Sequence, residues 1–396
     1  MYISLDGSET ANIWEILDST DTTKEQQFPG QLRIAGAGNS LDNVREMILT
    51  RHGNASWDMC KKRSFNIKLP SSESILGLKK SKSYVLIGNG KDKTLMRNYM
   101  ANELAKKLNC NYTVDMKYVT LYVNGVYRGL YLLSEKPKKV MKRALRNNSS
   151  ESFAVTFMSV DKDYVIPFSY SNGEFDGDEE QSEGNGYSVN LILPEEDRLS
   201  YEYYQDKVQQ LMDEIGSGDF SNIDIDSFVK YYWVQEATKN YDAWYRSLYF
   251  VYNADKSKWQ PDTPWDFDMS WNYFSTCTEI DFYNPYGLIG SHGIYKDLYL
   301  NEDVKERLST FYKNKVVPAL SEVRKEMYDV YDIIEEEARL DYQSANNDRE
   351  IPICTEEYFD ITFGTTYDEA FQNFVDYFDE RNRYLNDVYS ENAGNN

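Results

Sequence analysis

Strand-like and helix-like patterns are segregated along this chain, and their order is its strongest constraint on fold class. In the first third, short stretches such as Gln31 to Ile34 and Ser64 to Leu69 alternate apolar and polar residues with the period of two typical of half-buried strands. Most of the remainder carries apolar residues at helical spacing instead. Strands followed by helices, rather than strictly alternating with them, indicate an α+β fold.

One helix and one hairpin stand out within the strand-rich part. Apolar residues recur at helical spacing from Leu95 to Leu108, after a turn at Gly88-Asn89-Gly90, and predict the helix. Two strand-like runs flank Asn124-Gly125, which is the strongest short signal for a tight hairpin; they are Tyr118 to Val123 and Tyr127 to Leu133. We expect Pro70 to end the strand that begins at Ser64.

The rest of the chain predicts four helical regions and one further hairpin. The helical regions are 201–215, 225–240, 302–341 with a break at Pro318, and 367–389. Tyr249 to Tyr252 and Trp259-Gln260 predict a hairpin that leads directly to Pro264 to Asp268. Two segments poor in apolar residues predict exposed loops, Pro137 to Ser152 and Ser171 to Gly186.

Composition narrows the classes of partner and metal site. A formal net charge of −22 repels a phosphate backbone, so we expect no nucleic-acid partner. No apolar run approaches the roughly 20 residues that a membrane-spanning helix needs. Two histidines and four scattered cysteines form no HExxH or CxxC pattern, and we expect the cysteines to be mostly buried thiols. Any metal is therefore expected to bind carboxylates.

Three aspartates are the first candidates for chemistry. Asp266 and Asp268 are two residues apart, so in an extended segment their carboxylates point the same way and can share a cation such as Mg²⁺. Asp242 lies where the predicted helix from Ile225 gives way to a strand, and loops that follow helices often carry catalysis. An aspartate in such a place is more often a helix cap or a surface residue, so these acids alone do not decide the function.

The order of other polar residues favours phosphoryl transfer. A protein kinase uses a loop over the phosphates, a strand lysine, a helix glutamate, a catalytic aspartate and a metal-binding aspartate, in that order along the chain. Candidates occur here in the same order: Gly53 and Asn54 in a turn, Lys61, Lys62 and Lys68 on or beside a strand, Glu103 on the early helix, and then Asp242 and Asp266.

Four stretches together resemble the spore coat protein H (CotH) kinases, an atypical family of the kinase-like fold that is secreted or surface-associated. They span most of residues 50–275, and their order makes the likeness fairly specific although each alone is weak. The stretches are Arg51 to Trp57 with Lys61-Lys62 and Ile67 to Leu69; Lys93 to Asn98; Leu121 to Lys136 with Asn124-Gly125, Gly129 and Glu135-Lys136; and Pro264 to Asp268.

The resemblance implies an atypical protein-kinase-like two-lobed fold. Its β-rich N-lobe would cover residues 1–137, and its mainly helical C-lobe 138–396, with a catalytic hairpin at 242–268. The implied activity transfers the γ-phosphate of ATP, with Mg²⁺ or Mn²⁺, to Ser or Thr hydroxyls of a secreted, coat or surface protein. We accordingly expect an extracellular or surface location, a leader that has been removed, and a monomer.

The resemblance also implies a role for each candidate residue. Asp242 would orient the acceptor hydroxyl, and Asp266 and Asp268 would hold the metal. Ser247 would be a second metal ligand, where the family pattern often has Asn. The nucleotide would be held by Lys62 or Lys68, with Gly53, Asn54, Glu103 and Glu135. Two other departures from the pattern are His52 beside the turn, where Gly is usual, and Cys60, where Pro is common.

Three alternatives remain open at this point. Ser247 and the 34 tyrosines are compatible with a surface adhesion or scaffold-associated binding module, for instance for polysaccharide, because tyrosine rings stack on sugar faces. A different transferase on the same fold, such as an AMP-transferring enzyme, is a second alternative. A glycosidase would need two carboxylates spaced around a sugar, and no such pair is identifiable.

Overall fold

The amino-terminal third of the protein forms a closed β-barrel. The computed structural model describes residues 1–7, 17–36, 38, 43–60, 62–157, 164–169, 187–196, 198–240, 242–243, 247–271, 284–291, 295–346 and 366–391. Around the barrel the strand order is β1-β2-β3-β4-β5-β7-β6, and β1 closes it by pairing with both β2 and β6. The strands are β1 (Tyr2–Leu5), β2 (Phe28–Arg33), β3 (Arg45–His52), β4 (Ser64–Glu73), β5 (Ser81–Ile87), β6 (Met116–Val123) and β7 (Val126–Glu135).

Alternation along β4 shows how the sequence fills this barrel. Phe65, Ile67 and Leu69 are buried in the barrel core, whereas Lys68 between them is exposed. The expectation that Pro70 ends the strand was wrong, because β4 continues to Glu73. Proline has no amide hydrogen to donate, and the pairing of β4 with β5 is correspondingly interrupted between Lys68 and Glu73.

The predicted hairpin at Asn124-Gly125 is confirmed. It joins β6 to β7, whose pairing ends at Val123 and Val126. Both turn residues have positive φ, 49° at Asn124 and 79° at Gly125, as a two-residue turn of this kind requires.

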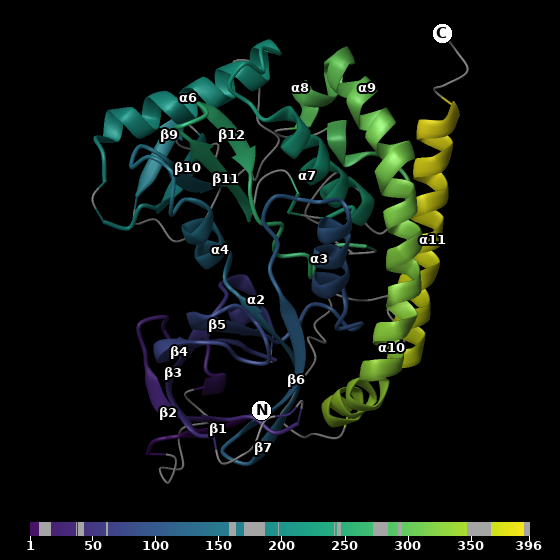
Figure 1. Cartoon of the computed structure of the whole chain (residues 1–396). Helices are drawn as coiled ribbons and strands as arrows, with labels where there is room; N and C mark the ends of the chain where they lie inside the picture. Colours follow the sequence, from purple (N-terminus) through teal and green to yellow (C-terminus); the bar gives the residue numbers. More distant parts are fainter. Residues whose placement is uncertain are drawn as a thin grey trace.

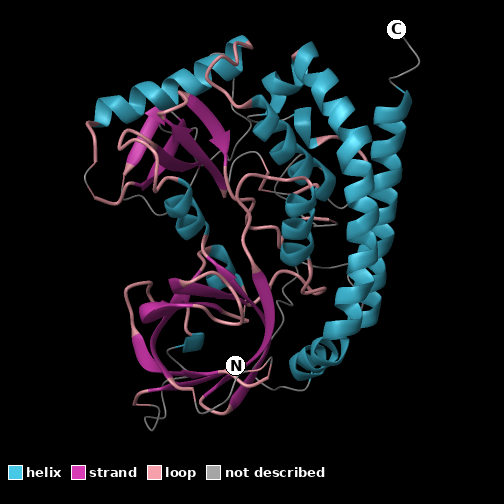
Figure 2. Cartoon of the chain, viewed as in Figure 1, coloured by secondary structure: helices cyan, strands magenta, loops and turns pink. Residues whose placement is uncertain are grey.

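A second sheet of five strands lies beyond the barrel, with the order β12-β11-β8-β10-β9. Its strands are β8 (Phe153–Phe157), β9 (Val165–Phe168), β10 (Tyr187–Leu193), β11 (Leu248–Asn253) and β12 (Lys258–Pro261). The sequence patterns predict only its β11–β12 hairpin. Every residue of β8 is buried, so no alternation marks it as a strand. Figure 2 shows the two groups of strands well separated, with helices beside both.

Helices fill most of the remaining described structure. They are α2 (Ala55–Met59), α3 (Arg97–Lys107), α4 (Pro137–Ala144), α6 (Tyr201–Ser217), α7 (Ile225–Thr238), α8 (Tyr295–Leu300), α9 (Glu302–Phe311), α10 (Val317–Asn346) and α11 (Tyr367–Glu391), with a 3₁₀ turn, η1 (Ile289–Ser291). This mixture confirms the α+β class. Among the described residues, none of the helices combines the length and apolar content needed to cross a membrane.

Two expectations about the helical parts need correction. The segment from Pro137 to Ser152 was expected to be a loop, but α4 occupies its first half and buries Val140 and Met141. The break expected at Pro318 is instead a π-helical turn, η2 (Tyr312–Val316), which carries α9 into α10 without a loop. Because α9, η2 and α10 are continuous, Pro318 lies in the interior of a helix, where it cannot donate a backbone hydrogen bond. A wider turn accommodates that loss.

A buried ion pair joins the barrel to α10. The Lys62 ammonium donates to the Leu130 carbonyl at 2.8 Å and pairs with Asp341 of α10, and neither charged side chain has any exposed surface. Asp341 also accepts from the Leu130 amide at 3.2 Å. Gly129, at φ 97°, lies against this carboxylate, because a Cβ there would be 2.4 Å from Asp341 Oδ1. Figure 1 shows α10 and α11 side by side along one flank, from the barrel to the level of the second sheet.

This pairing argues against the expected role of Lys62 as a phosphate ligand. Two of its three N–H groups are already used, and its side chain has no exposed surface to offer a nucleotide.

The Lys62–Asp341 pair predicts a large loss of stability when one partner is removed. Lys62→Met should lower the free energy of unfolding by about 3–5 kcal/mol, because it leaves the Asp341 carboxylate buried without a counter-charge. The double variant Lys62→Met/Asp341→Leu should recover most of that loss. Urea unfolding measures both, with Lys82→Met on the exposed face of β5 as the matched control. A single variant as stable as the control would contradict this.

Candidate active site

The three predicted aspartates lie in two loops around the end of α7. This helix ends in Lys239, which has a left-handed φ of 45°, and Asp242 follows in a buried turn with 5% of its surface exposed. Asp266 is half-buried and also has a positive φ, 68°, as has Ser247 at 52°. Such conformations are unfavourable for residues other than glycine, and they cluster at functional sites where surrounding contacts hold them.

Hydrogen bonds from distant parts of the chain bring these loops together. The Trp271 amide donates to the Thr238 carbonyl of α7 at 2.7 Å, which ties the segment after Asp268 to the helix that precedes Asp242. The Ser247 hydroxyl donates to Asp266 Oδ2 at 2.8 Å. Ser247 therefore lies beside the carboxylate with which it was expected to share a metal.

A lysine that the sequence analysis did not select lies among these acids. Lys91, 8% exposed, follows the Gly88–Gly90 turn, and its ammonium contacts the sulfur of Met269 at 3.3 Å. Burial by itself lowers the pKa of Lys91, but the negative charges of Asp268, Asp242 and Asp266 outweigh it and the pKa is raised. Lys91 therefore stays protonated and provides a buried positive charge beside the three carboxylates.

Asp92 fixes the turn that carries Lys91. Its fully buried carboxylate accepts hydrogen bonds from the Thr94 amide at 2.9 Å and hydroxyl at 2.6 Å, and from the Arg97 amide at 2.8 Å. These bonds satisfy amide groups at the start of α3, as a helix cap does. The turn also packs against Cys60 at the end of α2, because a Cβ at Gly90 would lie 2.7 Å from Cys60 Cβ.

Asp268 shows the electrostatic cost of gathering these acids. Burial raises its pKa, the negative charge of Asp266 raises it further, and together with the other nearby groups they bring it to about 7. Three carboxylates and one ammonium leave an excess of negative charge, and oxygen donors of this kind suit Mg²⁺ or Mn²⁺. Within the described ranges no three His, Cys, Asp or Glu side chains form a ready-made metal cage. Magnesium sites commonly use one or two carboxylates with phosphate and water, so the donor set fits that ion.

Two other predicted site residues, Glu103 and Glu135, form ion pairs with residues outside this group. Glu103 pairs with Lys106 of its own helix at 2.7 Å, rather than with a strand lysine. Glu135 is fully buried in a two-pronged ion pair with Arg143 of α4, at 2.7 and 2.9 Å, which anchors the link after β7. Both glutamates therefore have ion-pair partners outside the group of aspartates, and their expected contacts with the nucleotide stay predictions.

The remaining nucleotide candidates lie on the barrel. Gly53, at φ 95°, and Asn54 form the turn that starts α2, and a Cβ at Gly53 would lie 2.3 Å from Ser56 Oγ. Lys68 is exposed on the outer face of β4. Lys61 lies outside the described residues. The structure thus brings together Asp242, Ser247, Asp266 and Asp268 and leaves the phosphate roles of Gly53, Asn54 and Lys68 as predictions.

Two of the four cysteines lie in the described part of the chain. Cys60 and Cys110 are free thiols, the first buried and the second half-buried. Cys277 and Cys354, like His292, lie outside the described part of the chain.

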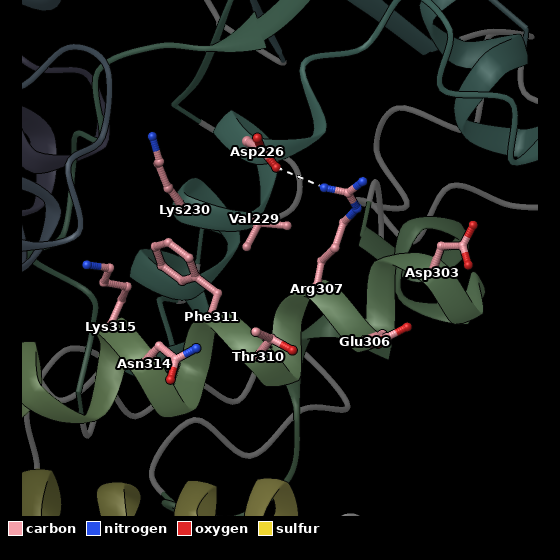
Figure 3. A pocket seen from close by; sticks show the side chains of 10 residues that line it. All are labelled: Asp226, Val229, Lys230, Asp303, Glu306, Arg307, Thr310, Phe311, Asn314 and Lys315. Carbon is pink, nitrogen blue, oxygen red and sulfur yellow. Dashed lines mark hydrogen bonds and ion pairs between the residues drawn. The ribbon is translucent and has the colours of Figure 1, made fainter.

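A surface pocket of about 640 Å³ lies away from these residues, between α7 and α9. Figure 3 shows the exposed ion pair of Asp226 and Arg307 in it, 3.1 Å apart, with Phe311 and Val229 as its apolar side chains. None of the aspartates discussed above lines this pocket. We therefore assign the chemistry to the group around Lys91 rather than to the pocket.

The geometry of the site can be set beside a comparison with protein families. The family described as CotH kinase protein matches residues 49–385, which contain Lys91 and all three aspartates. No curated protein matches the chain.

The raised pKa of Asp268 predicts how the metal-free protein responds to pH. The folded protein holds this proton up to about pH 7, whereas an unfolded chain loses it near the ordinary value of 3.8, so stability falls as pH rises through that interval. Asp268→Asn, which cannot ionise, should therefore be more stable than wild type near pH 8, by at most roughly 4 kcal/mol, and similar near pH 4.

Thermal unfolding in the presence of a chelator, at both pH values, measures this difference. Asp329→Asn on the exposed face of α10 is the control and should change stability little at either pH. An Asp268→Asn variant that is no more stable than wild type near pH 8 would contradict this prediction, because it would show that ionisation of the Asp268 carboxylate does not lower the stability of the folded protein.

Proposed function

The chain belongs to the CotH kinase family, and from this premise we propose that it transfers the γ-phosphate of ATP to Ser or Thr hydroxyls of a protein, with Mg²⁺ or Mn²⁺. The observation that most supports this is the buried Lys91 charge beside Asp242, Asp266 and Asp268. In this proposal the barrel and the part that follows it are the two lobes of an atypical protein-kinase-like fold, with the three acids in the second lobe.

Phosphoryl transfer depends on position and charge rather than on covalent chemistry by the protein. Lys91, held by the turn before α3, binds a phosphate oxygen of the nucleotide. Asp266 and Asp268 hold the metal, and the Ser247 hydroxyl orients Asp266 through its 2.8 Å hydrogen bond. A bound Mg²⁺ supplies positive charge to the phosphate oxygens.

Asp242 acts on the acceptor in this proposal. Its carboxylate accepts a hydrogen bond from the Ser or Thr hydroxyl and orients that oxygen toward the γ-phosphate. It takes up the hydroxyl proton as the oxygen bonds to the γ-phosphorus, while the bond from that phosphorus to the leaving ADP breaks. Its place directly after α7 gives it a rigid support, because the Thr238 carbonyl and the Trp271 amide fix this helix end to the segment of Asp266 and Asp268.

We also propose that the protein acts at the cell surface or outside the cell, on secreted, coat or surface proteins. The support is the resemblance of the motifs to a secreted family, together with an acidic composition rich in tyrosine.

The proposed phosphotransfer predicts that variants at the site and variants at the surface differ sharply in reaction rate. With labelled ATP and Mn²⁺, wild type should phosphorylate itself or a Ser/Thr-rich acceptor protein. Asp242→Asn should lower the rate by about 100-fold or more, because it removes the group that accepts the hydroxyl proton. Lys91→Met should weaken ATP binding as well as the rate. Asp226→Asn and Lys82→Met, both at exposed positions, are the matched controls.

The mass added to the acceptor distinguishes phosphate from AMP transfer. If wild type transfers nothing and ATP with Mn²⁺ does not raise its melting temperature, the proposed function is wrong. Glycan binding that is indifferent to ATP and metal would instead support a binding module.

A further inference from the structure

One side chain joins two of the segments that carry charges of the proposed site, the turn of Lys91 and the segment of Asp266 and Asp268. Asn98, on the first turn of α3 and 5% exposed, accepts a hydrogen bond from the Phe267 amide at 2.8 Å. Its amide nitrogen donates to Asn89 Oδ1 at 3.1 Å. Phe267 is the residue between Asp266 and Asp268, and Asn89 lies two residues before Lys91.

The Asn89 end of this link is itself rigid. Asn89 has a left-handed φ of 52°, its side-chain nitrogen donates to the Leu95 carbonyl at 3.3 Å, and its own carbonyl accepts from the Asp92 amide at 3.0 Å. The turn around Lys91 therefore cannot shift relative to Asn98 without breaking several buried hydrogen bonds. A buried polar group left without its partner is unfavourable, because it has lost its hydrogen bonds to water as well.

The Phe267 end holds the backbone between the two acids. Asp266 is in the left-handed region at φ 68°, an arrangement that persists only where its neighbours fix it. The bond from the Phe267 amide to Asn98 is such a constraint, because the orientation of that peptide group sets the directions in which the Asp266 and Asp268 side chains leave the backbone.

We propose that Asn98 is a positioning residue, which sets the separation between the Lys91 ammonium and the Asp266 and Asp268 carboxylates. The inference rests on the proposed phosphotransfer function for its consequence. An asparagine suits this place because one short planar group offers an acceptor to Phe267 and a donor to Asn89. A displacement of about 1 Å in such a site costs up to about 100-fold in rate.

The first experiment tests the link without any ligand. In Asn98→Leu, backbone hydrogen exchange should become faster in peptides that cover 88–92 and 266–268 at once, because both bonds are lost. In Asn98→Asp, which keeps an acceptor but no donor, exchange should become faster mainly in 88–92.

Asn102→Leu is the matched control. Asn102 is also buried on α3, one turn further on, and its side chain donates to the Val114 carbonyl at 2.9 Å instead of to the site. Its loss should leave exchange at 266–268 unchanged. Unchanged exchange at either segment in Asn98→Leu, or equal changes in the control, would overturn the inference.

The second experiment measures the consequence for the proposed reaction. Asn98→Leu should bind ATP with Mn²⁺ about tenfold more weakly than wild type and lose more in kcat than Asn102→Leu at equal unfolding stability. Equal losses in the two variants would mean that Asn98 is merely structural. If wild type does not bind ATP with Mn²⁺, the proposed function fails, and the exchange experiment still decides whether Asn98 fixes the two segments.

Discussion

The repulsion among Asp242, Asp266 and Asp268 is the constraint on which the rest of the site depends. Three carboxylates gathered with one ammonium are unfavourable in a folded protein. The pKa of Asp268 is raised by burial first and then by the negative charge of Asp266. Backbone hydrogen bonds hold the segment of Asp266 and Asp268 in place: the Trp271 amide ties it to α7, which precedes Asp242, and the Phe267 amide ties it to Asn98 of α3. Segments remote in sequence thus hold the carboxylates close together, and a bound cation would reduce the repulsion among them.

Buried ion pairs also fix the elements that surround the site. Glu236 of α7 pairs with Arg381 of α11, and both side chains are fully buried. Glu236 also accepts from the Ile289 and Gly290 amides at 3.1 and 2.9 Å, while Arg381 donates to the Pro285 and Gly287 carbonyls at 2.7 and 2.6 Å. This network fixes segment 284–291 against the helix that precedes Asp242. On the barrel side, the ion pair of Lys62 and Asp341 fixes α10 to the barrel.

Ion pairs give three of the predicted nucleotide-binding residues partners within the fold. Lys62, Glu103 and Glu135 have the charges and the order expected of a kinase, but all three are paired. Lys62 and Glu135 pair with Asp341 and Arg143, which the sequence does not reveal, whereas Glu103 pairs with Lys106 one helical turn away. The sequence alone does not distinguish a buried lysine from an exposed one. Conversely, Lys91 follows a turn that the sequence indicated clearly, yet nothing in the sequence placed it beside acids about 150 or more residues away.

Local patterns in the sequence were sufficient to predict the α+β class, the hairpin at Asn124-Gly125, the helix α3 and the adjacency of Asp266 and Asp268. Periodicity, turn chemistry and near neighbours are properties of short segments, so the sequence alone carries them. Only the tertiary structure decided that the strands close into a barrel and that the all-buried β8 belongs to a second sheet. It also decided that Lys91 lies beside the aspartates and that Asn98 bonds to the Phe267 amide between two of them. Those outcomes depend on which distant segments pack together, and pairing over such separations leaves no periodic signal in the chain.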